Sequence, residues 1–87
     1  MKVLMKSVDM IYLSNSEGVI FPIKFRYREG DQEPKVIRIE RIIDRKEERI
    51  AGNRMLVFTL QTTIDGVERI FEMKYEIQTF KWYLYKL

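Results

Sequence analysis

The segment from residue 56 to residue 75 constrains the fold most, because two alternating apolar runs flank the dipeptide Asp65-Gly66. Asp-Gly suits the positive φ angles of a two-residue type I′ turn, which closes a tight β-hairpin. A hairpin bent there has one apolar face and one mostly polar face, and a slip of one residue would mix the two. This pattern predicts an antiparallel β fold. The facing apolar pairs are Ile64 with Val67, Leu60 with Phe71, Phe58 with Met73 and Leu56 with Tyr75.

Length and composition predict one small globular domain. The chain has 87 residues, 46% of them apolar and 13% aromatic, which suffices for a packed core and argues against disorder. The net charge of +3 is a mild bias that permits nucleic-acid contact without requiring it. The apolar run in residues 1–6 is too short for a signal peptide, and no stretch approaches a membrane span. We therefore expect a cytoplasmic, bacterial-type domain with no membrane partner.

The chain contains no cysteine and no histidine. The lack of cysteine excludes disulfides, thiolate nucleophiles and zinc–thiolate sites, and the lack of histidine removes the commonest general base and metal ligand. Ser7, Ser14 and Ser16 have no histidine to activate them, and the sequence has no glycine-rich phosphate loop. We therefore expect no enzymatic activity, no metal, no cofactor and no small-molecule substrate.

The N-terminal half predicts two strands, at residues 10–13 and 19–28, separated by a turn at 14–18 and followed by a loop at 29–34. Pro22 cannot donate a ladder hydrogen bond, so the second strand lies on a sheet edge or bulges there. Residues 1–8 allow three interpretations: a frayed end, a short helical turn or an edge strand.

A third strand is expected over residues 35–43, with a bulge near Glu40-Arg41 that lets both Ile42 and Ile43 reach apolar surface. The alternative is a helix over residues 39–50, capped by Gly52. The many β-branched residues favour the strand. The polar segment 44–49 is either a solvated extension of that strand or one helical turn.

With strands at 54–64, 67–76 and 80–87, the chain has five to six short antiparallel strands in a single domain, residues 1–87. We expect them to curl into a small, partly open SH3-like all-β barrel, because curling shields the sheet edges. The order of strands around the barrel stays open. The predicted core consists of Ile23, Phe25, Ile37, Ile39, Ile43, Leu56, Phe58, Leu60, Phe71, Met73, Tyr75, Trp82 and Leu84.

The C-terminal strand is apolar on both faces, since Trp82 and Leu84 share one face and Tyr83 and Tyr85 share the other. Either residues 1–13 cover the second face or the strand presents an aromatic patch, and tyrosine and tryptophan are favoured interface anchors. We expect a non-enzymatic interaction module that docks a protein partner or a second copy here, or by strand addition along an exposed edge. The predicted docking residues are Trp82, Tyr83, Tyr85 and Leu87.

A competing class is a weak nucleic-acid binder that uses a basic strand face. Its candidate residues are Lys24, Arg26, Arg28, Arg38 and Arg41. Alternation, however, places Phe25 and Tyr27 opposite the cations, and stacking with phosphate contact needs both on one surface. A soluble outer face over core aromatics is the simpler interpretation. A purely structural accessory subunit, with no binding of its own, is a third class.

Three carboxylates, Glu68, Glu72 and Glu76, share one strand face with Lys74. Spaced carboxylates suit a hard cation or acid–base chemistry. Cross-strand pairing on a solvated face explains them better, because Lys74 lies between Glu72 and Glu76.

Four segments carry a resemblance to a known group: Pro22–Arg26, Ile39–Arg45, Phe71–Tyr75 and Lys81–Lys86. Over residues 10–87 the chain resembles small uncharacterised bacterial β-domain proteins, found mainly in Firmicutes, with a looser likeness to short actinobacterial domains. In that group an opening strand contains proline, a middle strand ends in an acidic–basic pair, and a strand with tryptophan closes the chain. Members are sometimes encoded beside Y-family translesion DNA polymerases, so the resemblance implies a link to DNA-damage tolerance. It implies no catalytic residues.

Overall fold

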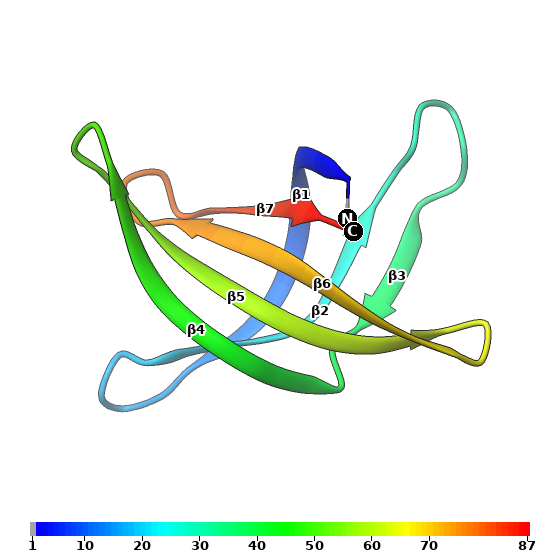
Figure 1. The fold of residues 1–87 in the computed structure, drawn as a ribbon, viewed down its shortest axis with the longest axis horizontal. Coiled ribbons are helices and arrows are strands. Elements are labelled where there is room, and N and C mark those ends of the chain that lie inside the picture. The colour runs from blue at the N-terminus through cyan, green and yellow to red at the C-terminus, as the bar shows by residue number, and fades with distance from the viewer. Residues whose placement is uncertain (1) are drawn as a thin grey trace.

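The computed structural model describes residues 2–87, which form seven β-strands and no helix (Figure 1). All neighbouring strands in the sheet are antiparallel. The strands are β1 (Val3–Ser14), β2 (Ile20–Tyr27), β3 (Lys35–Arg38), β4 (Arg41–Ile50), β5 (Asn53–Ile64), β6 (Val67–Glu76) and β7 (Lys81–Lys86).

The strands form one curled sheet in the order β3-β2-β1-β7-β6-β5-β4. The first and last strands pair, and the backbones of Lys2 and Leu87 exchange hydrogen bonds of 3.1 and 3.2 Å, so the two chain ends lie together (Figure 1). The sheet is interrupted at one place, between its edge strands β3 and β4. The result is an antiparallel half-barrel, which confirms the predicted small, partly open all-β barrel.

The hairpin that anchors the sequence prediction is present in the expected register. Asp65 and Gly66 have φ angles of 51° and 77°, as a type I′ turn requires, and Phe58 faces Met73 while Leu60 faces Phe71. A second turn of this kind joins β4 to β5 at Ala51-Gly52, where the φ angles are 51° and 80°. Two tight turns therefore fix the register across β4, β5 and β6.

The predicted strand at 35–43 is divided in two, which raises the strand number to seven. The chain turns a corner at Ile39-Glu40: the Ile39 N–H donates to the carbonyl of Ile23 at 2.8 Å, and the Glu40 N–H donates to the carbonyl of Gln61 at 2.9 Å. Two consecutive residues thus bond to opposite sides of the barrel opening. The alternative helix over 39–50 is wrong, because the polar segment 44–49 continues as strand β4.

Two isoleucines predicted in the core lie outside it because of β-bulges. The pairing of β1 with β2 skips Ile23, which follows Pro22 and is 39% exposed. The pairing of β4 with β5 skips Ile43, which is 41% exposed, whereas its neighbour Ile42 packs against the core. For the strand with Pro22 we expected either an edge position or a bulge, and the structure shows a bulge, at Ile23 directly after Pro22. The bulge expected near Glu40-Arg41 lies at Ile43 instead.

The N-terminal segment is a strand from Val3 onward, and Met1 lies outside the described residues. A bulge at Met5, where φ is 47°, shifts its pairing with β7. Strand β1 lies beside β7 in the sheet, with Ser7 opposite Tyr83, and does not cover the outer face of β7. Cover by residues 1–13, one of the two alternatives for the second face of this strand, is therefore absent from the part of the segment that the structure describes.

The core fills the concave side of the sheet. The predicted core residues that are buried are Phe25, Ile37, Phe58, Leu60, Phe71, Met73, Tyr75, Trp82 and Leu84. Ile39 and Leu56 pack against them and are partly buried. Ile20 and Tyr27 extend this core, while Met55 and Val57 are buried on the outer face of β5, where sequence alternation predicted solvent.

Replacing Phe58 with alanine should lower the free energy of unfolding by about 3–5 kcal/mol, because the side chain is fully buried and the cavity cannot close completely. That is a large share of the roughly 5–15 kcal/mol that stabilises a small domain. Urea unfolding followed by circular dichroism measures the loss. The control is Phe80→Ala, since Phe80 is 75% exposed, and its effect should stay within about 0.5 kcal/mol. Equal losses in both variants would contradict this account of the core.

Candidate functional site

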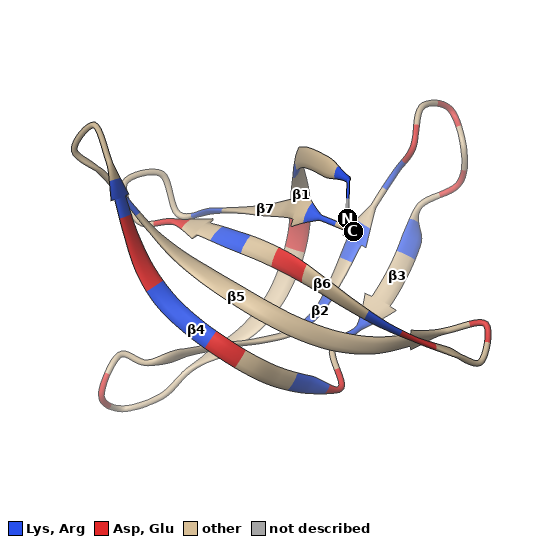
Figure 2. Cartoon of the chain, in the orientation of Figure 1, with Lys and Arg blue, Asp and Glu red and all other residues tan. Residues whose placement is uncertain are grey.

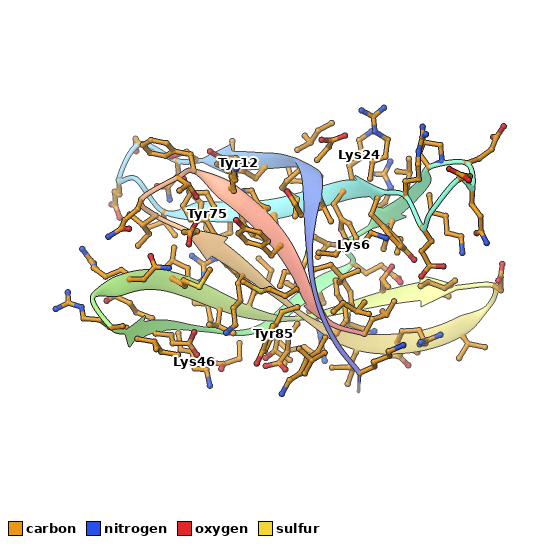
Figure 3. All side chains as sticks on the ribbon, turned by 90° about the horizontal axis from the view of Figure 1, so that it is seen from above. Lys6, Tyr12, Lys24, Lys46, Tyr75 and Tyr85 are labelled. Atoms are coloured by element: carbon orange, nitrogen blue, oxygen red, sulfur yellow. The ribbon has the colours of Figure 1, made fainter. Side chains whose placement is uncertain are left out.

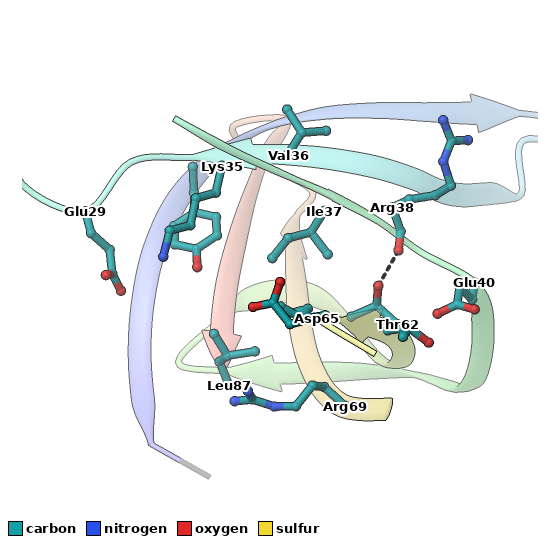
Figure 4. A pocket seen from close by; sticks show the side chains of 13 residues that line it. Glu29, Lys35, Val36, Ile37, Arg38, Glu40, Thr62, Asp65, Arg69 and Leu87 are labelled. Carbon is teal, nitrogen blue, oxygen red and sulfur yellow. Dashed lines mark hydrogen bonds between the residues drawn. The ribbon is translucent and has the colours of Figure 1, made fainter. Parts of the chain in front are cut away.

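The opening of the half-barrel forms a groove of about 930 Å³ between β3 and the β5–β6 hairpin (Figure 4). We call it the seam groove. Its apolar wall includes Ile37, Ile64 and Leu87, which come from β3, β5 and the C-terminal end of the chain. Three cations, Lys35, Arg38 and Arg69, and three carboxylates, Glu29, Glu40 and Asp65, also line it. A concave, partly apolar site of this volume is within the usual range of ligand pockets, about 300–1,000 Å³.

One hydrogen bond closes the inner end of the seam groove. The hydroxyl of Thr62, on the concave face of β5, donates to the carbonyl of Arg38 at 2.5 Å (Figure 4). Thr62 is 2% exposed. A side chain therefore takes the place of a backbone ladder bond between the two halves of the barrel, and the edge of β3 beyond it stays open.

The open part of β3 presents backbone groups to the groove. In an antiparallel pair, the backbone N–H and C=O groups of successive residues point alternately toward and away from the neighbouring strand. Because the N–H of Ile39 bonds to Ile23, the backbone groups of Ile37 also point toward β2. Val36 and Arg38 therefore direct their N–H and C=O groups into the seam. The carbonyl of Arg38 is satisfied by Thr62, whereas Val36 lies on the strand edge with β2 as its only neighbouring strand.

The other edge strand, β4, is protected by charge. Residues 44–49 are all charged, and Figure 2 shows blue and red alternating along this strand. The two-residue turn at Ala51-Gly52 fixes which residues of β4 exchange backbone hydrogen bonds with β5. The backbone N–H and C=O groups of Arg45, Glu47 and Arg49 therefore point away from β5, while their side chains point to the concave side of the sheet. Inward-pointing charges on an edge strand oppose pairing with another chain.

Arg45 spans the opening at the end away from the seam groove. Its guanidinium carbon lies 4.7 Å from the ring centroid of Phe21 on β2 and 5.3 Å from that of Phe58 on β5. Glu47 pairs with Arg54 on the same face. Cation–π contacts and an ion pair thus occupy this part of the opening.

The residues predicted for docking on β7 divide between three environments. Trp82 is 3% exposed and packs with Tyr12, Tyr75 and Phe58 at ring-centroid distances of 5.5, 5.0 and 5.4 Å. Trp82 therefore belongs to the core and is not available to a partner in this conformation. Its neighbour Tyr75 is affected by the same packing: burial raises the pKa of the Tyr75 phenol, and the neighbouring Tyr12 hydroxyl adds to the rise (Figure 3).

Tyr83 and Tyr85 lie half-buried on the outer face, and Leu87 is half-buried in the seam groove. The ammonium of Lys74 lies 3.8 Å from the ring centroid of Tyr85 and 2.9 Å from a carboxylate oxygen of Glu48. Lys74 is 7% exposed. Side chains of the sheet itself thus cover much of Tyr85, so the aromatic patch is smaller than the alternation suggested.

The predicted basic residues are brought together only in part. Lys24 lies directly opposite Arg38, and Arg26 lies opposite Val36, so these side chains share the outer face of β2 and β3. Arg26 pairs with Asp9 at 2.8 Å. Arg28 lines a hollow of about 380 Å³ beside Arg26, whereas Arg41 begins β4 on the other side of the barrel opening. The aromatic residues Phe25 and Tyr27 are buried beneath this face, as the soluble-face interpretation predicts.

The carboxylates of β6 pair with neighbouring strands. Glu72 lies 3.8 Å from the ammonium of Lys86. Glu76 accepts hydrogen bonds from the hydroxyl of Thr79 and, at 2.8 Å, from the amide nitrogen of Asn53. These two bonds, with the charge of Lys81, lower the pKa of Glu76 below its ordinary value. Within residues 2–87 no group of three carboxylates is placed to hold a metal ion.

The seam groove was not visible to sequence reasoning, because it depends on which strands stay unpaired. Thr62 was the one available signal. It is a polar residue at a position where alternation from Leu60 and Ile64 demands an apolar one. A buried hydroxyl needs a hydrogen-bond partner, which here is the edge of β3.

Comparison with family models, curated proteins and solved structures finds no match for this chain. The resemblance to small bacterial β-domain proteins therefore stays a prediction. Among the residues that the structure describes, no helix has the length and apolar character needed to cross a membrane.

The hydrogen bonds of Glu76 predict a pH dependence. The pKa of Glu76 is lower in the folded chain than its ordinary 4.5, so the ionised carboxylate stabilises the fold. This contribution to the free energy of unfolding is fully present above 4.5 and is lost as the pH falls through the folded pKa. In Thr79→Val the main hydrogen bond to Glu76 is missing, so the pKa of Glu76 should rise toward 4.5 and the loss of stability on acidification that Glu76 contributes should become smaller. Carboxyl-detected NMR titration measures both chains. A wild-type Glu76 that titrates at or above 4.5 would contradict the assignment.

Proposed function

We propose that the protein is a non-enzymatic interaction module that docks an extended segment of a protein partner in the seam groove. The observation that carries the proposal is a concave, partly apolar groove beside a strand edge with open backbone groups. Extended peptides commonly dock in this way, with main-chain bonds giving affinity and pockets giving side-chain selectivity. The absence of histidine and cysteine supports a non-enzymatic role.

The groove accounts for part of the predicted C-terminal docking surface. Leu87 lies in it, because the last residue of the chain pairs with Lys2 at the end of the barrel nearest the groove. Tyr83 and Tyr85 face the opposite side of the sheet, so they form a separate candidate surface. The groove is the better supported of the two, because it combines concave shape, apolar wall and an unpaired edge.

An unbiased peptide library displayed on phage tests the proposal. Peptides selected on the wild-type chain should lose about tenfold or more in affinity on Ile64→Glu, because a charge would replace the apolar wall of the groove. Ile70→Glu is the matched control. Ile70 lies on the same hairpin and is 54% exposed, but it does not line the groove.

Two results would overturn the proposal. One is the failure of any peptide to bind the folded wild-type chain. The other is binding that survives Ile64→Glu but is lost in the double variant Tyr83→Ser, Tyr85→Ser, which would move docking to the outer face of β7. Circular dichroism of each variant separates loss of binding from loss of folding.

A second candidate function, weak nucleic-acid binding, is favoured by one observation. Lys24 and Arg38 stand directly opposite each other on β2 and β3, and no carboxylate of residues 2–87 lies within 4.0 Å of either cation. Like charges in facing positions destabilise a sheet, so an added anion would relieve their repulsion. The link to DNA-damage tolerance that the family resemblance implies fits this alternative.

Salt dependence tests the nucleic-acid alternative. Binding of a labelled single-stranded oligonucleotide through phosphates should weaken steeply between about 50 and 200 mM salt. The triple variant Lys24→Glu, Arg26→Glu, Arg28→Glu should abolish it. Fluorescence anisotropy measures both. A wild-type chain that retains neither single nor double strands at about 50 mM salt would exclude this function.

A further inference from the structure

We propose that the exposed edge of β3 at Val36 accepts an extended segment with alternating acidic and apolar residues, which adds to the sheet as an eighth strand. The inference rests on the proposed docking function and specifies the chemistry of the partner segment. It is carried by three observations: the backbone groups of β3 that point away from β2, the excess of positive charge on the outer face of β3 and the apolar wall on its inner face.

The first observation concerns the backbone. Antiparallel pairing directs the N–H and C=O of Val36 away from β2 and into the seam, and the N–H of Arg38 points the same way. An added strand would satisfy these groups. The bond from Thr62 to the Arg38 carbonyl limits the added pairing to residues 35–38, which is about 13 Å of strand. Such a short pairing predicts a weak, reversible complex.

The second observation concerns charge on the outer face. Val36 is 64% exposed there and is flanked by Lys24, Arg26 and Arg38, while Asp9 pairs with Arg26 alone. A side chain of the added strand on this face would stand opposite Arg38 or Val36, while Lys24 and Arg26 lie one strand further away on β2, about 10 Å from the added strand. Carboxylates at these positions would offset the excess positive charge.

The third observation concerns the inner face, where the added strand would turn its alternate residues into the seam groove. Ile37, Ile64 and Leu87 form the apolar wall there. A valine or isoleucine of the added strand would bury its side chain against this wall. Alternation in a strand therefore places acidic residues outward and apolar residues inward.

A second copy of this chain is a poorer occupant. Pairing β3 with β3 of another copy would bring both sets of outer-face cations together, and facing like charges oppose association. The edge of β4 is a poorer acceptor as well, because its charged residues at 44–49 leave no apolar wall for the added strand.

A synthetic Glu-Val-Glu-Val-Glu-Val peptide tests the proposal against the full chain. By NMR hydrogen exchange, binding should slow exchange of the Val36 amide by about tenfold or more. The amide of Ile37 points to β2 and should change little, so it is an internal control. The variant Val36→Pro removes the outward N–H and should weaken binding by about tenfold, whereas Val36→Thr should bind normally. Proline is tolerated where the N–H faces away from the ladder, and circular dichroism confirms the fold of both variants.

Two control ligands separate the possible outcomes. The block peptide Glu-Glu-Glu-Val-Val-Val has the same composition without the alternation and should bind at least tenfold more weakly. An alternating Lys-Val peptide should not bind. If library peptides bind the groove while Val36 stays unprotected and Val36→Pro has no effect, strand addition is wrong and the proposed function stands. If neither library peptides nor the Glu-Val peptide bind, both fail. Binding of an oligonucleotide in place of the Glu-Val peptide would assign the cations to nucleic acid and overturn the inference.

Discussion

The corner at Ile39-Glu40 is the constraint on which the rest of this structure depends. Its two amides donate to carbonyls on opposite sides of the barrel opening, one to Ile23 and one to Gln61. The chain therefore passes from one edge of the sheet to the other in two residues, and no ladder forms between β3 and β4. Everything that distinguishes this half-barrel from a closed one follows: two edge strands, the groove between β3 and the β5–β6 hairpin, and the side-chain bond of Thr62 across the gap.

Much of the fold is predictable from local sequence because turns and alternation specify register. Asp65-Gly66 and the alternating runs beside it predict every facing pair from Leu56–Tyr75 to Ile64–Val67. The errors arise where the period of two fails. Ile23 and Ile43 are each the extra residue of a bulge, and a bulge turns a side chain to the face that counting assigns to its neighbour. Its position depends on the partner strand, which the local sequence does not specify.

The candidate site is less predictable than the fold, because the groove exists only where β3 and β4 do not pair with each other. The alternation of β7 correctly separates Trp82 from Tyr83 and Tyr85, but it does not reveal that Lys74 and Glu48 lie over the outer face. The basic residues on β2 and β3 do meet, since they belong to adjacent strands. Arg41 does not join them, because the corner carries it to β4. Only the sheet order shows which strand edges stay open.

The pairing of β1 with β7 has a consequence for how the chain acquires its structure. The bonds between Lys2 and Leu87 join the first and last described residues, so this contact spans nearly the whole chain. Loop-closure entropy must be overcome before such long-range pairing contributes stability, and folds of this kind form slowly. During synthesis, strands β1 to β3 must wait for β7 to leave the ribosome, with the aromatic side of the sheet still uncovered. Exposed apolar surface of this kind makes a nascent chain prone to aggregation until β7 is in place.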